Sequence, residues 1–193
     1  LFGDAGNDVI SGGNGSDTIS GGSGDDALDG GTGDDVLDGG IGNDVLDGGA
    51  GADVLVDRSG ANRLLGGEGN DEIRLDSSDD GIADGGDGDD TLSGGYGSDT
   101  LSGGAGDDII AVFAHTLGAF AFEQYVVTVD GGDGNDTITS DIRSESYASL
   151  ELSGGAGNDL FAFSSPFTKA IVEIKDFQTG DRIDLRGLLP SGV

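Results

Sequence analysis

The sequence of 193 residues contains no cysteine, methionine or tryptophan, and it has only 8 lysine and arginine residues against 38 aspartates and glutamates. Without cysteine, disulfide bonds and thiolate metal sites are excluded. The shortage of basic residues, with a formal net charge of −30, argues against nucleic acid and anionic membranes as partners and makes cations the natural ones. No apolar run approaches the ~18 residues of a transmembrane segment, and no signal peptide is visible. Such a polar, acidic chain is ordinarily expected to be disordered.

Glycine, in contrast, is abundant, and it recurs with a period of nine. The consensus unit is Gly-Gly-x-Gly-x-Asp-x-U-x, where U is a large apolar residue. Regular units occupy residues 3–56, 66–74, 85–111, 131–139 and 154–162. Disorder gives no reason for an apolar residue at a fixed place in every unit, so the repeat predicts an ordered solenoid.

Two units, 57–65 and 75–84, are degenerate. In the first, Asn62 replaces the aspartate of the sixth position. The second has one extra residue, and we assign Asp80 to its sixth position and Ile82 to its eighth. With these assignments the eighth position is large and apolar in all units.

The spacing itself predicts a metal-binding stack. The glycines permit backbone angles closed to other residues, so a tight loop can turn its carbonyl oxygens inward. The aspartate ends the loop, and the next three residues form a short strand whose apolar side chain points inward. Two units then make one coil of eighteen residues, which places Asp35 between Asp17 and Asp53 of the neighbouring coils. Such carboxylates repel one another unless a cation lies between them, and an all-oxygen ligand set favours Ca²⁺ over Mg²⁺.

The nonapeptide resembles the RTX (repeats-in-toxin) repeat. The resemblance implies an all-β fold, a right-handed parallel β-roll that binds several Ca²⁺ ions, roughly six to ten. It also implies export by the type I secretion machinery of a Gram-negative bacterium. The family folds outside the cell on binding calcium, so the resemblance implies a secreted, extracellular protein.

In the RTX family one ion is held by two stacked loops. The lower loop gives the carbonyls of its second and fourth residues and its aspartate, and the upper loop gives those of its first and third residues and its aspartate. On this resemblance the expected metal ligands are Asp8, Gly13, Gly15, Asp17, Gly21, Gly22, Ser23, Gly24, Asp26, Gly30, Gly31, Thr32, Gly33, Asp35, Gly39, Gly40, Ile41, Gly42, Asp44, Gly48, Gly49, Ala50, Gly51, Asp53, Gly66, Glu68, Asp71, Gly85, Gly86, Asp87, Gly88, Asp90, Asp99, Gly103, Ala105, Asp108, Gly132, Gly134, Asp136, Gly154, Ala156 and Asp159.

Two of these sites depart from the regular pattern. The loops of Asp136 and Asp159 are 23 residues apart instead of 18, so five residues are expected to bulge out. Asn62 brings no charge, so we expect the site that it shares with Asp44 to be weak or empty.

The C-terminal residues 174–185 resemble the stretch that closes β-rolls in serralysin-type proteases, although Arg182 directly follows Asp181 here. We therefore expect a strand-rich C-terminal capping segment over residues 163–193, because an open solenoid end exposes apolar rungs and unpaired strand edges. The remaining organisation is expected to be a regular roll over 1–111 and an interrupted roll with excursions over 112–162.

The excursions hold much of the aromatic content. Residues 125–129 predict a longer strand. The aromatic residues here are Phe113, Phe120, Phe122, Tyr125, Tyr147, Phe161, Phe163 and Phe167. They favour a wider, aromatic-filled core, and the alternative is that the 112–153 excursions bind a ligand or partner.

The sequence contains no catalytic motif. His115 is the only histidine, so it cannot form a zinc site without partners, and neither His-Glu-x-x-His nor Gly-x-Ser-x-Gly occurs. We therefore expect no enzyme, but a calcium-binding module that stabilises or caps a larger extracellular toxin, protease, lipase or adhesin, with the N-terminal parts of that protein as partners. One alternative is a carbohydrate-associated accessory module of an alginate-acting enzyme, which requires clustered basic residues. Another is an adhesin or ice-binding solenoid, which requires a flat row of threonines.

Overall fold

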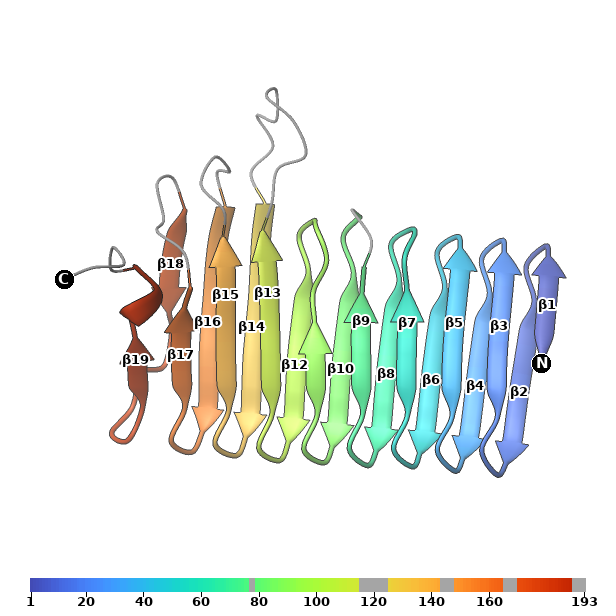
Figure 1. The fold of residues 1–193 in the computed structure, drawn as a ribbon, viewed down its shortest axis with the longest axis horizontal. Helices are drawn as coiled ribbons and strands as arrows, with labels where there is room; N and C mark the ends of the chain where they lie inside the picture. Colours follow the sequence, from blue (N-terminus) through green and yellow to red (C-terminus); the bar gives the residue numbers. More distant parts are fainter. Residues whose placement is uncertain (77–78, 115–124, 143–147, 165–169, 189–193) are drawn as a thin grey trace, which may run out of the picture.

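The computed structural model describes residues 1–76, 79–114, 125–142, 148–164 and 170–188 of the chain. They form a stack of coils, each with two short strands and two turns (Figure 1). Odd-numbered strands pair only with odd-numbered ones and even-numbered strands only with even-numbered ones, in parallel. The predicted all-β parallel β-roll is confirmed. No helix of the described residues is long and apolar enough to cross a membrane.

The two sheets face each other across the roll. The first contains, in order, β1 (Phe2–Ala5), β3 (Thr18–Ser23), β5 (Val36–Ile41), β7 (Val54–Asp57), β9 (Glu72–Leu75), β11 (Thr91–Ser93), β13 (Ile109–Ala114), β15 (Thr137–Ile142), β17 (Leu160–Phe163) and β19 (Arg182–Asp184). The second contains β2 (Val9–Asn14), β4 (Ala27–Thr32), β6 (Val45–Ala50), β8 (Arg63–Glu68), β10 (Ile82–Asp87), β12 (Thr100–Ala105), β14 (Tyr125–Asp133), β16 (Ala148–Ala156) and β18 (Ile171–Ile174).

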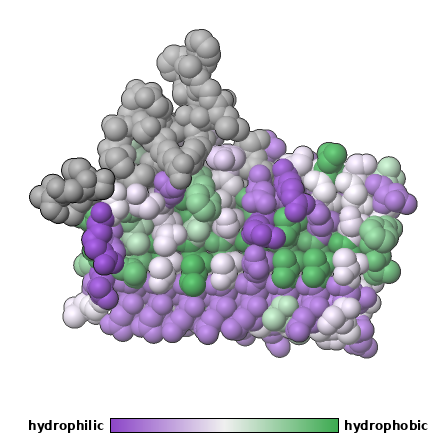
Figure 2. Space-filling view, viewed as in Figure 1, coloured by the Kyte–Doolittle hydropathy of each residue, from purple (hydrophilic) through white to green (hydrophobic). Residues whose placement is uncertain are grey.

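The turns form two edges, which we name from their place in Figure 1. The lower edge holds the turns from even to odd strands, at 12–17, 30–35, 48–53, 66–71, 85–90, 103–108, 131–136, 154–159 and 175–181. The upper edge includes the turns at 3–8, 21–26, 39–44, 57–62 and 94–99. Figure 2 shows the lower edge as a continuous hydrophilic band, with apolar side chains gathered over the sheet above it.

The core is a column of apolar side chains between the sheets. Because side chains alternate along a strand, Leu37 is fully buried while the preceding Val36 is 43% exposed. The inward residues of successive strands are Ile19, Leu28, Leu37, Leu46, Leu55, Leu64, Ile73, Ala83, Leu92, Leu101, Ile110, Val129, Ile138, Leu152 and Phe161. Each coil buries its apolar pair against the next coil, which explains why a single unit could not fold alone.

The sequence assignment of the second degenerate unit was wrong. Ile82 pairs with Arg63 and Thr100 and is 44% exposed, whereas Ala83 pairs with Leu64 and Leu101 and is 1% exposed. The extra residue therefore precedes Gly81, which takes the sixth position in place of Asp80. The Gly81 amide donates a hydrogen bond of 2.9 Å to Oδ1 of Asp99, as the amides of the turn aspartates do elsewhere. The inward position of this unit holds a small residue.

The core widens toward the C-terminus. The predicted longer strand is confirmed as β14, which has nine residues, and β16 matches it. The additional buried residues are Leu75, Val112, Val127, Ala148, Leu150 and Phe163, so aliphatic side chains supply most of the widening. Phe113 is 41% exposed. His115, Phe120, Phe122, Tyr147 and Phe167 lie outside the described residues, as do most residues of the predicted excursions.

The C-terminal segment extends the roll. Strands β18 and β19 add a last pair to the two sheets, followed by the short 3₁₀ helix η1 (Arg186–Leu188). The ring of Phe177 lies 6.3 Å from that of Phe161. However, Ile171, Phe177 and Ile183 remain about half exposed or more. In the described part of the chain, this segment therefore continues the solenoid and does not form a layer that covers the end of the roll.

Candidate metal centres

Glycine has two different roles in the turn at 30–35. Gly31 and Gly33 have φ angles of 101° and 119°, a region that side chains disfavour. Gly30 has an ordinary φ but no room for a side chain. A Cβ atom there would lie 2.6 Å from both Oδ2 of Asp35 and the carbonyl oxygen of Gly48. These two oxygens, from successive lower-edge turns, therefore converge on one point.

Other carbonyl groups of the same two turns face the same space. A Cβ atom on Gly49 would overlap the carbonyl oxygen of Gly31, and one on Gly51 would overlap that of Gly33. The carbonyls of Gly31 and Gly33 are therefore directed toward the next turn. We call the space between two successive turns, lined by these oxygens, a cradle. The structure thus brings together the second and fourth residues and the aspartate of one turn with the first residue of the next.

The third residues of the turns are arranged differently. Their carbonyls accept a hydrogen bond from the fourth-position amide one coil earlier, as Ala50 does from Gly33 at 2.7 Å. The same bond is made by the carbonyls of Ser23, Thr32, Ile41, Glu68, Asp87, Ala105 and Ala156. A carbonyl oxygen has two lone pairs, so one remains for a metal.

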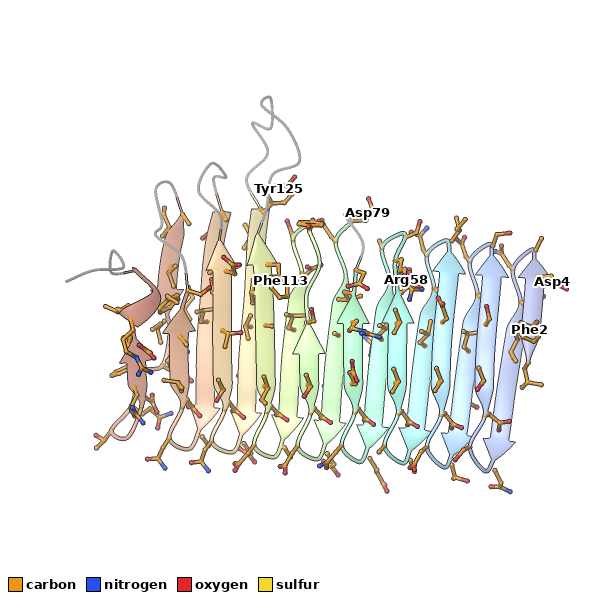
Figure 3. All side chains as sticks on the ribbon, viewed as in Figure 1. Phe2, Asp4, Arg58, Asp79, Phe113 and Tyr125 are labelled. Carbon is orange, nitrogen blue, oxygen red and sulfur yellow. The ribbon has the colours of Figure 1, made fainter. Side chains whose placement is uncertain are left out.

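The aspartates of the lower edge form an unbroken ladder. The amide of Asp17 donates to Oδ1 of Asp35 at 2.6 Å, and that of Asp35 donates to Oδ1 of Asp53 at 2.7 Å. The predicted position of Asp35 between its neighbours is confirmed. The ladder continues through Asp71, Asp90, Asp108, Asp136 and Asp159 to Asp181. Figure 3 shows the side chains repeated along this edge.

The ladder keeps its register where the coils are longer. The turns of Asp108 and Asp136 are 28 residues apart, and those of Asp136 and Asp159 are 23 apart. The amide of Asp136 still donates to Oδ1 of Asp159 at 3.0 Å. The predicted stacking of these two turns is confirmed.

In most turns the second oxygen of the aspartate carboxylate is left without a donor. Among the described residues, no group donates a hydrogen bond to the buried Oδ2 atoms of Asp8, Asp26, Asp35, Asp44, Asp53, Asp57, Asp71, Asp90, Asp108, Asp136 and Asp159. A buried carboxylate without a partner is strongly destabilising unless it is protonated or neutralised by a cation. The repeated oxygens, all of them hard ligands, fit calcium.

The raised pKa values of the turn aspartates also indicate that no positive charge of the described residues lies beside these carboxylates. Burial raises the pKa of Asp90 to about 7, opposed by the hydrogen bond from the Asp71 amide and reinforced by the charges of Asp71 and Asp108. Burial likewise raises the pKa of Asp71, Asp108 and Asp136 to about 6. These carboxyl groups resist ionisation in the absence of a cation.

The upper edge follows the regular pattern only at its N-terminal end. The amide of Asp8 donates to Asp26 and that of Asp26 donates to Asp44, at 2.8 and 2.7 Å. Asp99, a predicted ligand, differs because its carboxylate accepts hydrogen bonds from the amides of both Gly81 and Gly95. The structure therefore does not give Asp99 the unpartnered oxygen of the other turns.

The turn at 57–62 is built on other contacts. The Asn62 side-chain nitrogen donates to the carbonyls of Gly60 and Ser59, at 3.1 and 3.3 Å, and to Oδ1 of Asp57 at 2.7 Å. The side-chain amide of Asn62 thus donates hydrogen bonds to oxygens of its own turn. Asp57 occupies the place of the first glycine and is not among the ligands predicted from the repeat. Asp57 could have been predicted from its position, because it lies five residues before Asn62 in a unit that lacks the expected aspartate.

The last lower-edge turn is also modified. The side-chain nitrogen of Gln178 donates to the carbonyl of Gly155 at 2.5 Å, and Asp176 accepts hydrogen bonds from the amides of Gly154 and Gly155. A carbonyl of the type directed into the other cradles is therefore engaged by a side-chain amide here.

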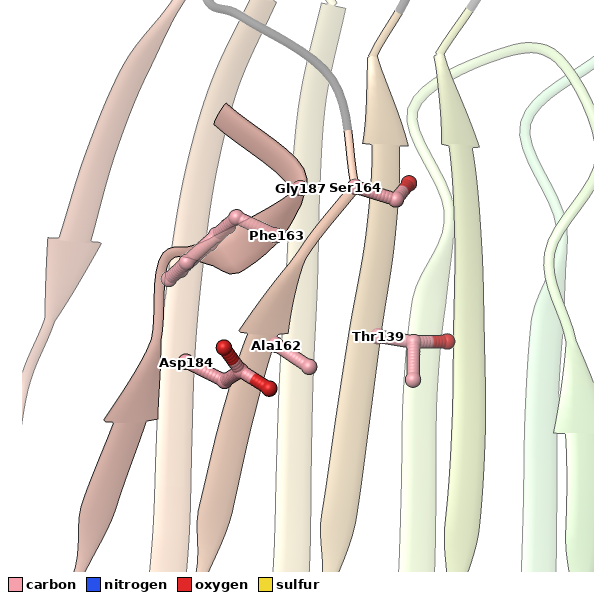
Figure 4. A pocket seen from close by; sticks show the side chains of 6 residues that line it. All are labelled: Thr139, Ala162, Phe163, Ser164, Asp184 and Gly187. Carbon is pink, nitrogen blue, oxygen red and sulfur yellow. The ribbon is translucent and has the colours of Figure 1, made fainter. Parts of the chain in front are cut away.

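A shallow pocket of about 200 Å³ lies beside β17, near the C-terminal end (Figure 4). It is lined by Thr139, Ala162, Phe163, Ser164, Asp184 and Gly187. The Asp184 carboxylate is engaged by the Arg186 guanidinium, so the pocket offers no free charged group. Among the described residues, no three carboxylate, imidazole or thiol side chains converge as a metal-binding group, which agrees with cradles made mainly of backbone carbonyls.

Comparison with known families supports the same assignment. The chain matches the RTX calcium-binding nonapeptide repeat over residues 1–28, 20–55, 57–83, 84–111 and 127–142. The C-terminal residues 143–193 lie outside the match. No curated protein matches the chain. Since the matched segments cover well over half of the sequence and contain most of the turns described above, the chain belongs to the RTX calcium-binding repeat family and is a calcium-binding parallel β-roll domain.

Proposed function

We propose that this domain is a calcium-dependent folding module of a larger extracellular protein, and that it has no catalytic activity of its own. The observation that supports the proposal is the series of buried, unpartnered Oδ2 atoms along both edges. The roll brings these carboxylates into register, and a cation in each cradle would offset their repulsion. The free energy of calcium binding then becomes free energy of folding.

The arrangement of regular turns gives the expected number of ions. Eight regular turns of the lower edge, from 12–17 to 154–159, enclose seven cradles, and the upper-edge turns 3–8, 21–26 and 39–44 enclose two more. Nine divalent ions would offset 18 of the 30 net negative charges. Where calcium is scarce, self-repulsion would keep the chain extended, a state suited to passage through a type I secretion machinery. In extracellular calcium the roll would close.

Circular dichroism tests this proposal. In the presence of a chelator the spectrum is expected to be that of a disordered chain, and millimolar Ca²⁺ is expected to restore β-structure. Mg²⁺ at the same concentration is the control, and it should be much less effective because it requires tighter octahedral geometry. A β-spectrum that is unchanged by the chelator would refute calcium-dependent folding.

No described feature favours the alternative functions. In the first sheet the outward position before the core residue reads Thr18, Val36, Val54, Glu72, Thr91, Ile109 and Thr137. This row is not the continuous threonine array of an ice-binding face. Four of the described basic residues, Arg58, Arg74, Lys175 and Arg186, each lie against a carboxylate, so these four form no free cationic groove for a polysaccharide.

A further inference from the structure

Asp57 stands where other turns carry their first glycine. It ends β7, is fully buried, and directs its carboxylate toward the turn at 39–44. A Cβ atom on Gly39 would overlap Oδ2 of Asp57 and lie 2.7 Å from Oδ2 of Asp44. The two carboxylate oxygens therefore converge over Gly39. In the regular cradle over Gly30, the same two places are taken by Oδ2 of Asp35 and the carbonyl oxygen of Gly48.

The other polar atoms around this point have partners. Oδ1 of Asp57 accepts hydrogen bonds from the amide of Ser59 at 3.0 Å and from the Asn62 side chain at 2.7 Å. Oδ1 of Asn62 accepts from the Asp44 amide at 2.8 Å, and Oδ1 of Asp44 accepts from the Asp26 amide. Only the Oδ2 atoms of Asp44 and Asp57 are left without a donor among the described residues. Asp44 is 1% exposed and Asp57 0%.

The nearest arginine in the sequence does not neutralise this pair. Arg58 is labelled in Figure 3, and its largely exposed guanidinium lies 2.9 Å from the carboxylate of Asp38. Two adjacent carboxylates in a buried site disfavour each other's charge, so the pair requires either a cation from outside the chain or a shared proton. A neutral ligand is also at hand, because a Cβ atom on Gly60 would overlap the carbonyl oxygen of Gly42, which is therefore directed into the same space.

We propose that Asp44 and Asp57 hold a divalent cation, with Ca²⁺ preferred, between the turns at 39–44 and 57–62. The Asp57 side chain replaces a glycine carbonyl as ligand, and it supplies the negative charge that is lost where Asn62 replaces an aspartate. The turn is thus a rearranged calcium site, contrary to the weak or empty site expected from Asn62 alone. This inference depends on the proposed calcium binding of the regular cradles.

The test compares calcium stoichiometry in the full chain by isothermal titration calorimetry. Asp57→Asn keeps the shape of the side chain and can donate to Asp44, so it should fold in calcium but bind one ion fewer than the unaltered chain. Asp47→Asn is the matched control, because Asp47 is exposed on β6, three residues from Asp44, and its loss should leave the stoichiometry unchanged. Equal stoichiometry and affinity for Asp57→Asn and the unaltered chain would overturn the proposal. If the unaltered chain binds no calcium, calcium-dependent folding itself fails.

A second measurement needs no variant. In crystals of the unaltered chain grown with calcium, an anomalous peak between Asp44 and Asp57 would support the site. Peaks in the regular cradles without one here would refute it, and would mean that the two carboxyl groups share a proton.

Discussion

Asp17 and Asp35 lie one coil apart, and the amide of Asp17 donates a hydrogen bond of 2.6 Å to Oδ1 of Asp35. The other oxygen of Asp35 faces the cradle toward the turn at 48–53, where no described group donates to it. One carboxylate therefore borders two successive cradles. This sharing couples neighbouring sites, so binding of one ion should favour binding of the next.

Removal of the shared charge should weaken two sites together. Asp35→Asn keeps an oxygen for the Asp17 amide but loses the carboxylate, and we expect about tenfold weaker binding at both adjacent cradles, or about 1.4 kcal/mol each. Titration of the variant with calcium in a calorimeter measures this loss of affinity. Asp34→Asn is the control, because Asp34 is exposed and its Oδ1 accepts a hydrogen bond from the Ala52 amide on the outside of the edge. An effect on a single site would show that the carboxylate is not shared.

The inward and outward residues of β5 should respond in opposite ways to a charge. Leu37→Asp should prevent folding even in saturating Ca²⁺, because it buries a carboxylate between the sheets. Val36→Asp should leave the fold intact, since Val36 is 43% exposed. Circular dichroism in saturating Ca²⁺ distinguishes them. The milder Leu37→Ala should cost about 2–5 kcal/mol in unfolding free energy, and a fully stable variant would contradict the described core.

Alanine substitutions at two glycines with similar backbone angles distinguish the effect of backbone strain from the effect of a side chain placed inside a cradle. Gly13 and Gly40 have φ angles of 98° and 106°, so alanine at either should cost about 1–2 kcal/mol in backbone strain. A Cβ atom on Gly13 would meet nothing within 4 Å, whereas one on Gly40 would overlap the carbonyl oxygen of Gly22. Gly40→Ala should therefore also lose a bound calcium ion, and Gly13→Ala should not. Equal ion counts in the two variants would argue against the carbonyl of Gly22 as a ligand.

The metal-free chain should become more ordered in mild acid. In the folded state burial raises the pKa of Asp57 and Asp90 to about 7 and that of Asp71 to about 6, above the ordinary value of 3.8. Between these values the folded state binds more protons than the unfolded one, so its stability falls as pH rises through this window. Calcium-free protein should thus show more β-structure at about pH 5 than at about pH 7.5 by circular dichroism.

When Ca²⁺ is present, the pH dependence of folding should reverse, because protons compete with the ion for the same carboxylates. The calcium midpoint for folding should therefore rise as the pH is lowered. A calcium-free chain that remains equally disordered at both pH values would contradict the raised pKa values.

The repeat allowed the sequence to predict the parallel roll, the inward column that includes Leu37, and the ladder on either side of Asp35. Each of these follows from a local pattern that is repeated in register. The placement of Ala83 did not follow, because the pattern does not say where in the unit the extra residue lies, and the more apolar Ile82 appeared to fit. The role of Asp57 depends on Asp44 and on the absence of a side chain at Gly39, both in the preceding upper-edge turn. Such a compensation between coils is visible only once their stacking is known.

The lower edge has a further consequence for how such a chain can vary. Successive lower turns remain bonded to each other whether they are separated by 18, 23 or 28 residues. The lower edge thus keeps one register throughout the roll, while the connections from odd to even strands can differ in length. Foreign peptides grafted at the upper edge should therefore be displayed side by side at the regular interval of the strands, without disturbing the proposed calcium sites of the lower edge.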